Sequence, residues 1–509
     1  MMRLADVLWA SVERYGPRPA VTDARTGQSL TYAELGRESA RVARFAADHG
    51  VARAQRIGLA AANDPAHLAA AFGLLAAGAC IVPVAGHLRA AEVDEIARDI
   101  ELNGCFRSPR TEVPGLEDHG GATLSDGVCG GFRLAWVDRA RAGPPAFAAL
   151  DPAFVRFTSG TTAASKGVVL AHDATLARVE AADRVLRFGP DDRIAWVLPL
   201  AYHFAVTIVA YVRAGAHIVL CPDTLPGAIV EAVERHRATV LYASPAHVER
   251  IAALEPRGRL ASLRLALSTS APISGRAVER FESACGVPLG QAYGIIEAGL
   301  PCINPGGAGI APTSVGRPVP GYDVAVFSDE GDRRDAGVAG EIGLRGAGLF
   351  SAYYAPWRPL EEIARDGWFM TGDVGRFDET GALHLVGRKK AVIFVGGLKF
   401  FPEEVEACID AFPGVQESRV FGRAHPRLGE IPCADVVSRS PRLDAGALRA
   451  HCARLLSPWK VPVEIARVDA IPKTAGGKIL RRPVEDAQER DSGHDGARSR
   501  PAAAPRRKA

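Results

Sequence analysis

A loop of small and hydroxyl-bearing residues is the clearest sign of chemistry in this chain of 509 residues. It lies within residues 157–170, FTSGTTAASKGVVL. Small residues let the backbone approach a ligand closely, and successive amide N–H groups can form a concavity that binds anions. Ser159, Thr161 and Thr162 add hydroxyl donors, and Lys166 adds a mobile positive charge. The pattern predicts polyphosphate binding, with a plain surface turn as the alternative, although it lacks the Gly-Lys-Ser/Thr run of the common P-loop.

Four further motif segments follow the loop along the chain. They are LPLAYHF (198–204), QAYGIIE (291–297), GWFMTGDVGRFDETGALHLVGRKK (367–390) and PKTAGGKILRR (472–482). Together with the loop, they resemble the adenylate-forming superfamily, which includes acyl- and aryl-CoA synthetases, carrier-charging adenylation domains and firefly luciferase. The resemblance extends from about Leu4 to about Arg482. Because five matches occur in the expected order, the sequence is identified as a member of this superfamily.

The resemblance implies which residues bind MgATP. Glu297 would hold Mg²⁺ against the phosphates, and Tyr293 would stack on adenine. Asp373 would accept hydrogen bonds from the ribose hydroxyls, and Arg388 would make a second ribose contact. The set implied in nucleotide binding is Thr158, Ser159, Gly160, Thr161, Thr162, Lys166, Ser270, Ala271, Pro272, Gln291, Ala292, Tyr293, Gly294, Ile296, Asp373 and Arg388. Outside their motifs, a surface glutamate, a core aromatic and a surface ion pair are the alternative interpretations.

The resemblance also implies a reaction in two steps. A carboxylate attacks the α-phosphate of MgATP to give an acyl-adenylate and pyrophosphate, and a thiol then displaces AMP. Lys478 would neutralise charge on the α-phosphate, and His203 would lie beside the substrate carboxylate. A surface lysine and a core or surface histidine are the alternatives. A small domain would move between the steps about the hinge residue Lys390, and Gly396 and Gly397 would admit the pantetheine arm of CoA, unless they form a plain turn.

Three positions depart from the superfamily pattern. Ala163 replaces a glycine, Ser165 replaces a proline, and Ile296 replaces a threonine that touches the phosphate. Losing one hydroxyl contact weakens nucleotide binding by about 1 kcal/mol, which tunes an enzyme without abolishing its activity. A working enzyme is therefore expected, with a non-catalytic nucleotide-binding relic as the alternative.

The acid is predicted to be a small-to-medium aryl or acyl carboxylate. The sequence HFAVT lacks the aspartate that amino-acid-activating domains usually place after the histidine, so a free amino acid is disfavoured. Analogy with plant-type aryl-CoA ligases implies a substrate pocket of His203, Ala205, Val209, Thr269, Ala292 and Leu300. Thr269 and Ala292 occupy positions where a glycine often leaves room for long or bulky acids.

The acceptor is predicted to be the thiol of CoA, which makes the protein an acyl-CoA ligase with ATP, Mg²⁺ and CoA as cofactors. One alternative is a stand-alone acyl-AMP ligase that charges the phosphopantetheine of a separate carrier protein. No carrier domain is visible, because the tail around Asp491 and Ser492 lacks the context of an attachment site. A luciferase-like oxygenase shares the same motifs and is a further alternative.

Composition limits the other possibilities. The net charge of +3 is small and the basic residues are dispersed, so no nucleic acid partner is expected. The nine cysteines include no CxxC pair, which disfavours a zinc site, and their odd number fits reduced thiols better than a disulfide framework. Residues 65–88 lack Asp, Glu, Lys and Arg but contain glycine and proline. A membrane-spanning helix needs ~20 strongly apolar residues, so this stretch instead predicts a buried helix ending near Gly78 and a strand at 80–84. Without a signal peptide, a cytoplasmic protein is expected.

Short apolar runs alternate with amphipathic stretches of helical length, which predicts βαβ units and a largely parallel sheet. The runs are residues 56–60, 194–198, 217–221 and 239–243. Residues 315–349 instead predict short antiparallel strands in a small barrel or distorted sheet. A compact α+β segment should follow, with strands at 391–395 and 418–421 and a helix at 402–411.

These patterns and the resemblance together predict an α/β protein of several parts. Residues 1–387 would form a large AMP-binding domain of two doubly wound α/β subdomains plus a small β-barrel. Residues 388–390 would form the hinge and residues 391–483 a small mobile α+β domain. Residues 484–509 are polar, rich in Pro, Ala and Arg and without periodicity, so they should be disordered.

Overall fold

The computed structural model of the chain divides into two compact units, the larger ending at Lys389 and the smaller beginning at Lys390. The structure describes residues 2–86, 88–116, 118–157, 167–221, 224–307, 309–395, 398–439, 443–473 and 479–480. The predicted phosphate loop at 158–166, the glycines Gly396 and Gly397, the catalytic candidate Lys478 and the tail at 484–509 lie outside the described residues.

One nine-stranded sheet of the larger unit has the order β16-β15-β14-β13-β12-β10-β11-β1-β2. Neighbours from β14 through β1 run parallel, whereas β15, β16 and β2 are antiparallel to their neighbours. The strands are β1 (Pro19–Asp23), β2 (Ser29–Thr31), β10 (Arg193–Trp196), β11 (His217–Leu220), β12 (Val240–Ala243), β13 (Leu265–Ser268), β14 (Leu289–Ile295), β15 (Gly299–Asn304) and β16 (Arg317–Pro318). β12 and β13 are buried along their whole length, which explains their continuous apolar sequences.

A second nine-stranded sheet has the order β20-β19-β9-β8-β4-β3-β5-β7-β6. Its central neighbours β8, β4, β3 and β5 are parallel, and the remaining pairs are antiparallel. The strands are β3 (Arg56–Ala60), β4 (Cys80–Pro83), β5 (Gly104–Arg107), β6 (Gly121–Thr123), β7 (Arg133–Trp136), β8 (Pro152–Phe157), β9 (Gly167–Ala171), β19 (Ala352–Tyr353) and β20 (Arg358–Pro359). The strands predicted from the four apolar runs are therefore confirmed as β3, β10, β11 and β12.

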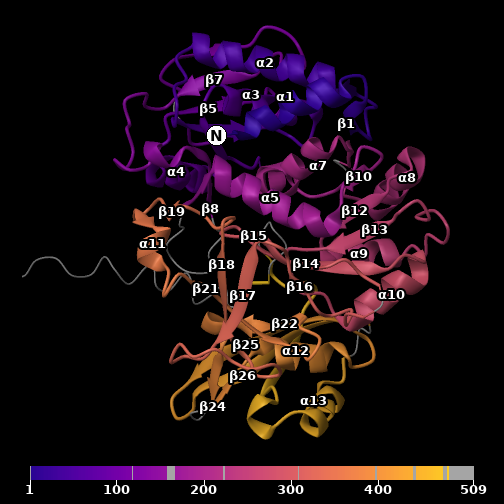
Figure 1. Cartoon of the computed structure of the whole chain (residues 1–509). Coiled ribbons are helices and arrows are strands. Elements are labelled where there is room, and N and C mark those ends of the chain that lie inside the picture. The colour runs from indigo at the N-terminus through magenta and orange to yellow at the C-terminus, as the bar shows by residue number, and fades with distance from the viewer. Residues whose placement is uncertain are drawn as a thin grey trace, which may run out of the picture. The chain divides into compact units, whose positions relative to one another are not determined.

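Helices cover and separate these sheets. α1, α2 and α3 pack against one another, and α3 and α5 each contact strands of both sheets (Figure 1). The helices of this unit are α1 (Leu4–Tyr15), α2 (Tyr32–Asp48), α3 (Pro65–Ala76), α4 (Ala90–Asp99), α5 (His172–Leu186), α6 (Leu200–His203), α7 (Val209–Ala214), α8 (Pro226–His236), α9 (Pro245–Ala252), α10 (Gly275–Cys285) and α11 (Leu360–Ile363), with short turns η1 (Ala148–Leu150) and η2 (Phe204–Ile208).

The charge-free stretch forms the buried helix α3, followed by strand β4, as predicted. Asp64 caps this helix by accepting a hydrogen bond from the His67 amide at 3.1 Å, and Pro65 occupies its first turn. The helix is buried on all sides, so its sequence needs no polar face. Within the described parts of the chain, no helix has both the length and the apolar character that crossing a membrane requires.

A third sheet of the larger unit is antiparallel throughout, with the order β17-β18-β21-β22. Its strands are β17 (Tyr322–Phe327), β18 (Gly340–Gly346), β21 (Phe369–Phe377) and β22 (Leu383–Arg388). The first two strands lie in the segment for which the sequence predicts a small barrel or distorted sheet. The three sheets and their helices confirm the predicted α/β class.

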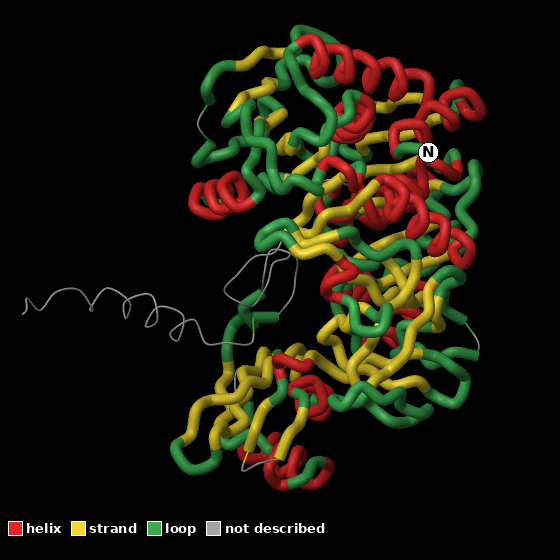
Figure 2. Tube along the Cα trace, turned by 60° about the vertical axis from the view of Figure 1, so that its left-hand side comes forward, coloured by secondary structure: helices red, strands yellow, loops and turns green. Residues whose placement is uncertain are grey.

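The smaller unit is built on the long antiparallel pair of β25 and β26 (Figure 2). Apolar residues of α12 and α13 share one hydrophobic core with these two strands. Its elements are η3 (Lys389–Ala391), β23 (Ile393–Val395), β24 (Leu398–Phe400), α12 (Pro402–Asp410), β25 (Val415–His425), β26 (Gly429–Ser438), α13 (Ala445–Leu455), η4 (Pro458–Lys460) and β27 (Glu464–Arg467). The predicted helix is confirmed as α12. The strand predicted at 391–395 begins later, at Ile393, because a 3-10 turn takes up Ala391, and the strand predicted at 418–421 is the middle of a longer one.

Buried histidines should make the stability of the larger unit depend on pH. Burial lowers the pKa of the buried His67 and His172, and of the half-buried His217, to about 4. His172 Nδ1 also accepts a hydrogen bond from the Leu4 amide at 3.1 Å, which requires that nitrogen to be unprotonated. In the unfolded chain these histidines bind protons below a pKa of about 6.5, whereas in the folded chain they bind protons only near pH 4. The stability that is present above pH 6.5 is therefore lost as the pH falls toward 4.

We expect the free energy of unfolding to fall by about 2 kcal/mol per buried histidine from about pH 7 to about pH 5. Urea denaturation at both pH values measures the change. A His172→Asn variant, which retains an acceptor, should show a smaller pH dependence than the wild type. Equal free energies at the two pH values would contradict the assignment.

Candidate active site

The hairpin of β14 and β15 positions the acidic motif. Tyr293 lies opposite Cys302, but the register shifts between Tyr293 and Ile295, and the chain then turns through Glu297 into β15. Gly294 lies at this shift, where an added Cβ would come within 2.8 Å of the Leu300 side chain. Only a glycine fits there without displacement of that side chain. The hairpin therefore places Glu297 in a turn at one end of the pair.

The Glu297 carboxylate is half-buried and retains free acceptor capacity. Its Oε1 accepts a hydrogen bond from the Tyr353 hydroxyl at 3.1 Å, and its backbone oxygen accepts one from the Phe350 amide at 2.7 Å. Across the described ranges, no three His, Cys, Asp or Glu side chains are arranged to hold a metal ion. A single carboxylate suits Mg²⁺, which commonly takes one or two protein carboxylates and completes its shell with phosphate and water oxygens. The residues present therefore fit the predicted magnesium site.

Arg178 on α5 fixes the backbone of this turn. Its side chain is 1% exposed, and its two terminal nitrogens donate to Ile296 O at 2.9 Å and to Glu297 O at 3.3 Å. Its buried Nε has no hydrogen-bond partner among the described residues. Arg178 was not predicted from the sequence as a site residue, because an arginine within an amphipathic helix normally indicates a solvent-exposed face.

Replacing Arg178 by methionine should lower kcat/KM for MgATP by about tenfold to hundredfold. Methionine keeps a long apolar side chain, but the carbonyls of Ile296 and Glu297 lose their donor and the turn loses its anchor. The rate of pyrophosphate exchange at varied MgATP measures the effect. Arg213→Met on α7 removes an exposed arginine and serves as the matched control. An Arg178→Met rate equal to that of the control would show that the anchor is dispensable.

Three predicted nucleotide-binding residues lie together, Asp373 and Arg388 on the third sheet and Tyr293 on β14 of the first sheet. Asp373 on β21 lies opposite Arg388 on β22. Arg388 forms an ion pair with Asp373, with Nε 2.8 Å from Oδ1, and the Tyr293 hydroxyl donates a hydrogen bond to Asp373 Oδ2 at 2.7 Å. Burial and the neighbouring Asp373 raise the pKa of Tyr293 well above 10, so the hydroxyl stays protonated and donates. Each carboxylate oxygen keeps a second lone pair, which leaves acceptors for two ribose hydroxyls.

A second group of predicted residues follows β13. Thr269, Ser270, Ala271 and Pro272 leave the carboxyl end of this parallel strand, the edge where open α/β sheets bind ligands. Ser270 has a φ of +79°, in the left-handed region that costs a non-glycine residue about 1 kcal/mol. On the adjacent β14, the side-chain amide of Gln291 donates to Pro312 O. The predicted residues of this turn and those of β14 therefore lie on neighbouring parts of one sheet, because β13 and β14 are adjacent parallel strands.

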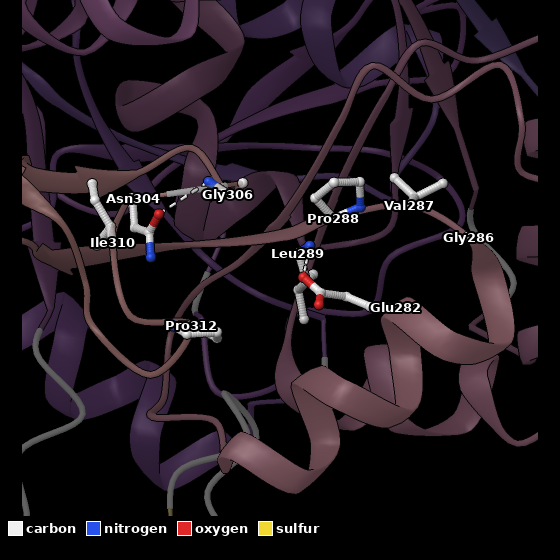
Figure 3. Close-up of a pocket in the computed structure, with 10 residues that line it drawn as sticks. Glu282, Gly286, Val287, Pro288, Leu289, Asn304, Gly306, Ile310 and Pro312 are labelled. Atoms are coloured by element: carbon white, nitrogen blue, oxygen red, sulfur yellow. Dashed lines mark hydrogen bonds between the residues drawn. The ribbon is translucent and has the colours of Figure 1, made fainter.

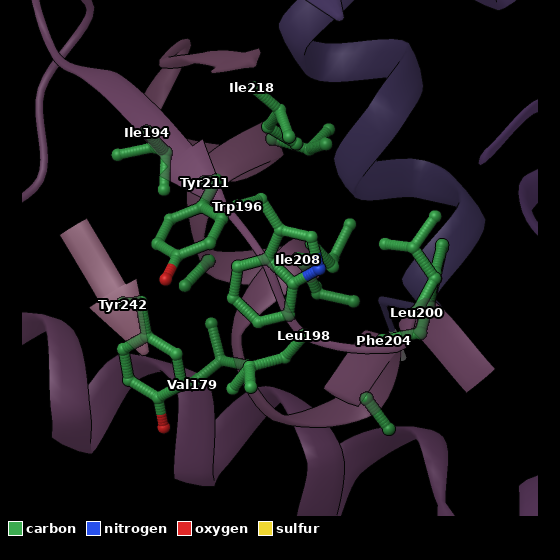
Figure 4. Packing of buried hydrophobic residues seen from close by; sticks show 14 of the residues in the cluster. Val179, Ile194, Trp196, Leu198, Leu200, Phe204, Ile208, Tyr211, Ile218 and Tyr242 are labelled. Carbon is green, nitrogen blue, oxygen red and sulfur yellow. The ribbon is translucent and has the colours of Figure 1, made fainter. Parts of the chain in front are cut away.

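His203 ends α6 beside a cluster of buried aromatic residues. Its ring centroid is 5.6 Å from that of Trp196 and 6.2 Å from that of Tyr242, both in edge-on contacts. Trp196 and Tyr242 stack at 5.4 Å, and Figure 4 shows them with Tyr211 in the surrounding core. Burial, reinforced by the positive charge of Arg156, lowers the pKa of His203 to about 3. The His203 imidazole is therefore neutral near pH 7, so it carries no positive charge.

A π-helical turn follows His203 directly. The turn η2 (Phe204–Ile208) joins α6 to α7, and Gly215, with a φ of +74°, caps the C-terminal end of α7. Such turns insert one extra residue into a helix and frequently occur at functional sites. The turn contains Ala205, one of the predicted substrate-pocket residues.

The predicted substrate pocket draws on elements far apart in the sequence. Ala205 and Val209 belong to the main hydrophobic core, Thr269 follows β13, Ala292 lies on β14 and Leu300 on β15. All five are buried. Their role in binding an acyl group remains a prediction.

A different cavity of about 370 Å³ lies where α10 leads into β14 (Figure 3). Its polar side chains already have partners, because Glu282 accepts a hydrogen bond from the Leu289 amide at 2.9 Å and Asn304 accepts one from the Gly306 amide at 3.0 Å. None of the predicted site residues lines this cavity.

The remaining predicted residues flank or fall outside the described chain. β8 and β9 are antiparallel neighbours with Phe157 opposite Gly167, so residues 158–166 connect two adjacent strand ends. Lys390 is exposed at the start of the smaller unit. Gly396, Gly397 and Lys478 lie outside the described residues, and their roles stay predictions.

Comparisons with known proteins extend over nearly the whole chain. Residues 8–354 match the family described as AMP-binding enzyme, and residues 404–478 match the AMP-binding enzyme C-terminal domain. A feruloyl-CoA synthase from Amycolatopsis sp is 31% identical, covering 93% of this chain and 97% of that protein. An indoleacetate–CoA ligase from Aromatoleum aromaticum is 30% identical, covering 90% and 93%. MatB from Rhodopseudomonas palustris, solved with ATP bound, has a TM-score of 0.82 and 25% identity, covering 97% of this chain and 99% of that chain.

Proposed function

The chain belongs to the AMP-binding enzyme family, and on this premise we propose that it activates a carboxylic acid with ATP and transfers the acyl group to the thiol of CoA. The membership confirms the resemblance to adenylate-forming enzymes found in the sequence. Two relatives with near-complete coverage are a feruloyl-CoA synthase and an indoleacetate–CoA ligase, which supports CoA as the acceptor.

The cluster of Tyr293, Asp373 and Arg388 is the observation that carries the proposal. The buried Asp373 carboxylate is held by one hydrogen bond and one ion pair and has lone pairs to spare, so it is suited to bind the hydroxyls of a ribose. Glu297 follows Tyr293 by four residues on the same hairpin, so one element would present both the nucleoside and the magnesium ligands. Mg²⁺ held there would neutralise part of the phosphate charge.

The proposed first step forms a mixed anhydride. A carboxylate oxygen of the acid attacks the α-phosphorus, the bond from that phosphorus to the bridging oxygen breaks, and pyrophosphate leaves. His203, being neutral, would orient the carboxylate by a hydrogen bond without adding charge. Lys478 would supply the positive charge that the transition state requires.

The proposed second step forms a thioester. The sulfur of CoA loses its proton and attacks the acyl carbon, and AMP leaves with the electrons of the broken C–O bond. The smaller unit would change position between the steps about Lys390, where the boundary between the two compact units falls. Gly396 and Gly397 would then let the pantetheine arm pass close to the backbone.

The acid is proposed to be a small-to-medium aryl or acyl carboxylate. The aromatic acids named for the two relatives support the aryl class. Pyrophosphate release should therefore be measured with aryl, short, medium and long-chain acids, each with and without CoA, together with mass analysis of the products.

Acid-dependent release with acyl-CoA as the product would support the proposal. The highest kcat/KM with long-chain acids would overturn the substrate class. Release without any acyl-CoA would point to a separate carrier protein as the acceptor, and no release with any acid would contradict carboxylate activation.

A further inference from the structure

Arg156 is a buried arginine at the end of β8, immediately before Phe157 and the predicted phosphate loop. It is 6% exposed and lies opposite Val168 on β9. Side chains alternate along a strand, so Arg156 shares a face of the sheet with Phe154. The Phe154 ring lies 6.0 Å from that of Phe204, the residue that follows His203. This face of β8 is therefore the one that approaches the His203 segment.

The surroundings of Arg156 supply little opposing charge. It interacts electrostatically with Tyr202, His203 and Glu297, and it is repelled by Arg178. Within the described ranges, no residue forms a hydrogen bond or an ion pair with its guanidinium. The neighbouring residues 158–166 include one lysine and neither Asp nor Glu.

The other buried arginines have dedicated partners. Arg56 donates to the backbone oxygens of Glu101, Arg141 and Ala142. Arg419 Nε donates to the carboxylate of Asp435 at 2.9 Å. Arg178 holds the acidic turn as described above. Burying a guanidinium without a partner is costly, so the isolation of Arg156 indicates a site for an anion that binds from outside the chain.

Glu297 cannot serve as a lasting partner if the proposed function is correct. Its carboxylate accepts a hydrogen bond from Tyr353 and would be committed to Mg²⁺. The carboxylate that the enzyme activates is also unsuitable, because it gives up its charge when it becomes a mixed anhydride and stays uncharged in the thioester. A guanidinium keeps its charge throughout both steps.

We propose that Arg156 binds a second acidic group of the acyl substrate, so that the preferred acids carry one carboxylate in addition to the one that is activated. The proposal rests on the proposed function and specifies its substrate class. A second carboxylate keeps its charge through both steps, and the planar guanidinium can bind it through two parallel hydrogen bonds.

Matched pairs of acids test this proposal. Hexanoate is compared with adipate, and 4-methylbenzoate with terephthalate, by the kcat/KM for acid-dependent pyrophosphate exchange. For the pair that fits the pocket, the wild type should prefer the diacid by about tenfold or more, the effect of one charge-assisted hydrogen bond. Arg156→Leu should reverse this preference and Arg156→Lys should restore part of it, whereas Arg98→Leu, which removes an exposed arginine on α4, should retain the full preference.

The outcomes separate this proposal from the one on which it rests. Equal kcat/KM for monoacids and diacids in the wild type would overturn the role of Arg156 and leave carboxylate activation standing. An equal loss on both members of a pair in Arg156→Leu would place the arginine on the activated carboxylate or the phosphates, and would also overturn it. No exchange with any acid would overturn both proposals. If Arg156→Leu fails to fold, the wild-type ratio and the Arg156→Lys variant decide.

Discussion

Replacing Lys478 by alanine is expected to slow acyl-adenylate formation by about 100- to 1,000-fold, the cost of removing one preorganised charge donor from a transition state. The lysine would neutralise the charge that develops on the α-phosphate while the acid attacks. Acid-dependent pyrophosphate release in single-turnover conditions measures the rate of this step directly.

Lys473 provides a matched control from the same motif. Its ammonium group forms an ion pair with Glu417 at 2.5 Å, so it has a structural partner in the smaller unit. Lys473→Ala should retain most of the rate of adenylate formation. Thioester formation from a supplied acyl-adenylate should be affected far less by Lys478→Ala than the first step. An equal loss in both steps would mean that Lys478 maintains the fold instead of assisting the chemistry.

The second large effect is expected at Asp373. Replacing it by alanine removes the carboxylate that accepts a hydrogen bond from Tyr293 and forms an ion pair with Arg388, and it leaves a buried hydroxyl and a guanidinium without their partner. KM for ATP should rise by about tenfold to hundredfold, because a charged acceptor for the ribose hydroxyls is lost. Initial rates at varied MgATP with a saturating acid measure the change.

The same sheet offers a matched control for Asp373. Asp323 on β17 lies opposite Arg345 on β18 and bonds to it at 2.7 Å, but this pair is exposed. Exposed ion pairs contribute little to stability, so Asp323→Ala should leave KM for ATP within about twofold of the wild-type value. If Asp373→Ala behaves like Asp323→Ala, the buried cluster does not bind the nucleotide.

The sequence predicted the secondary structure of the parallel sheets well because buried strands require continuous apolar runs. Residues 56–60 and 217–221 could be recognised from composition alone, and they form β3 and β11. Element boundaries were less accurate where turns intervene. The 3-10 turn of Lys389–Ala391 delays the next strand, and its local sequence carries no proline or glycine that would have marked it.

The candidate site was predictable in part. Asp373 and Arg388 belong to one motif, and the hairpin of β21 and β22 brings them opposite each other. Arg156 and Arg178 could not be assigned, because their burial depends on elements distant in the sequence. Arg178 donates a hydrogen bond to a turn more than a hundred residues further along the chain, and a local sequence pattern cannot predict such a contact.

The π-helical turn of Phe204–Ile208 makes this region more sensitive to chain length than to side-chain identity. Deleting one residue there would restore regular α-helical winding and rotate everything before the deletion by roughly 100° about the helix axis. His203 lies directly before the turn and would then face away from Trp196 and Tyr242. Point substitutions at Ala205 would reshape the surroundings of the histidine, but a single-residue deletion would change its direction. The spacing between His203 and Gly215 is therefore the property to compare when related chains are aligned.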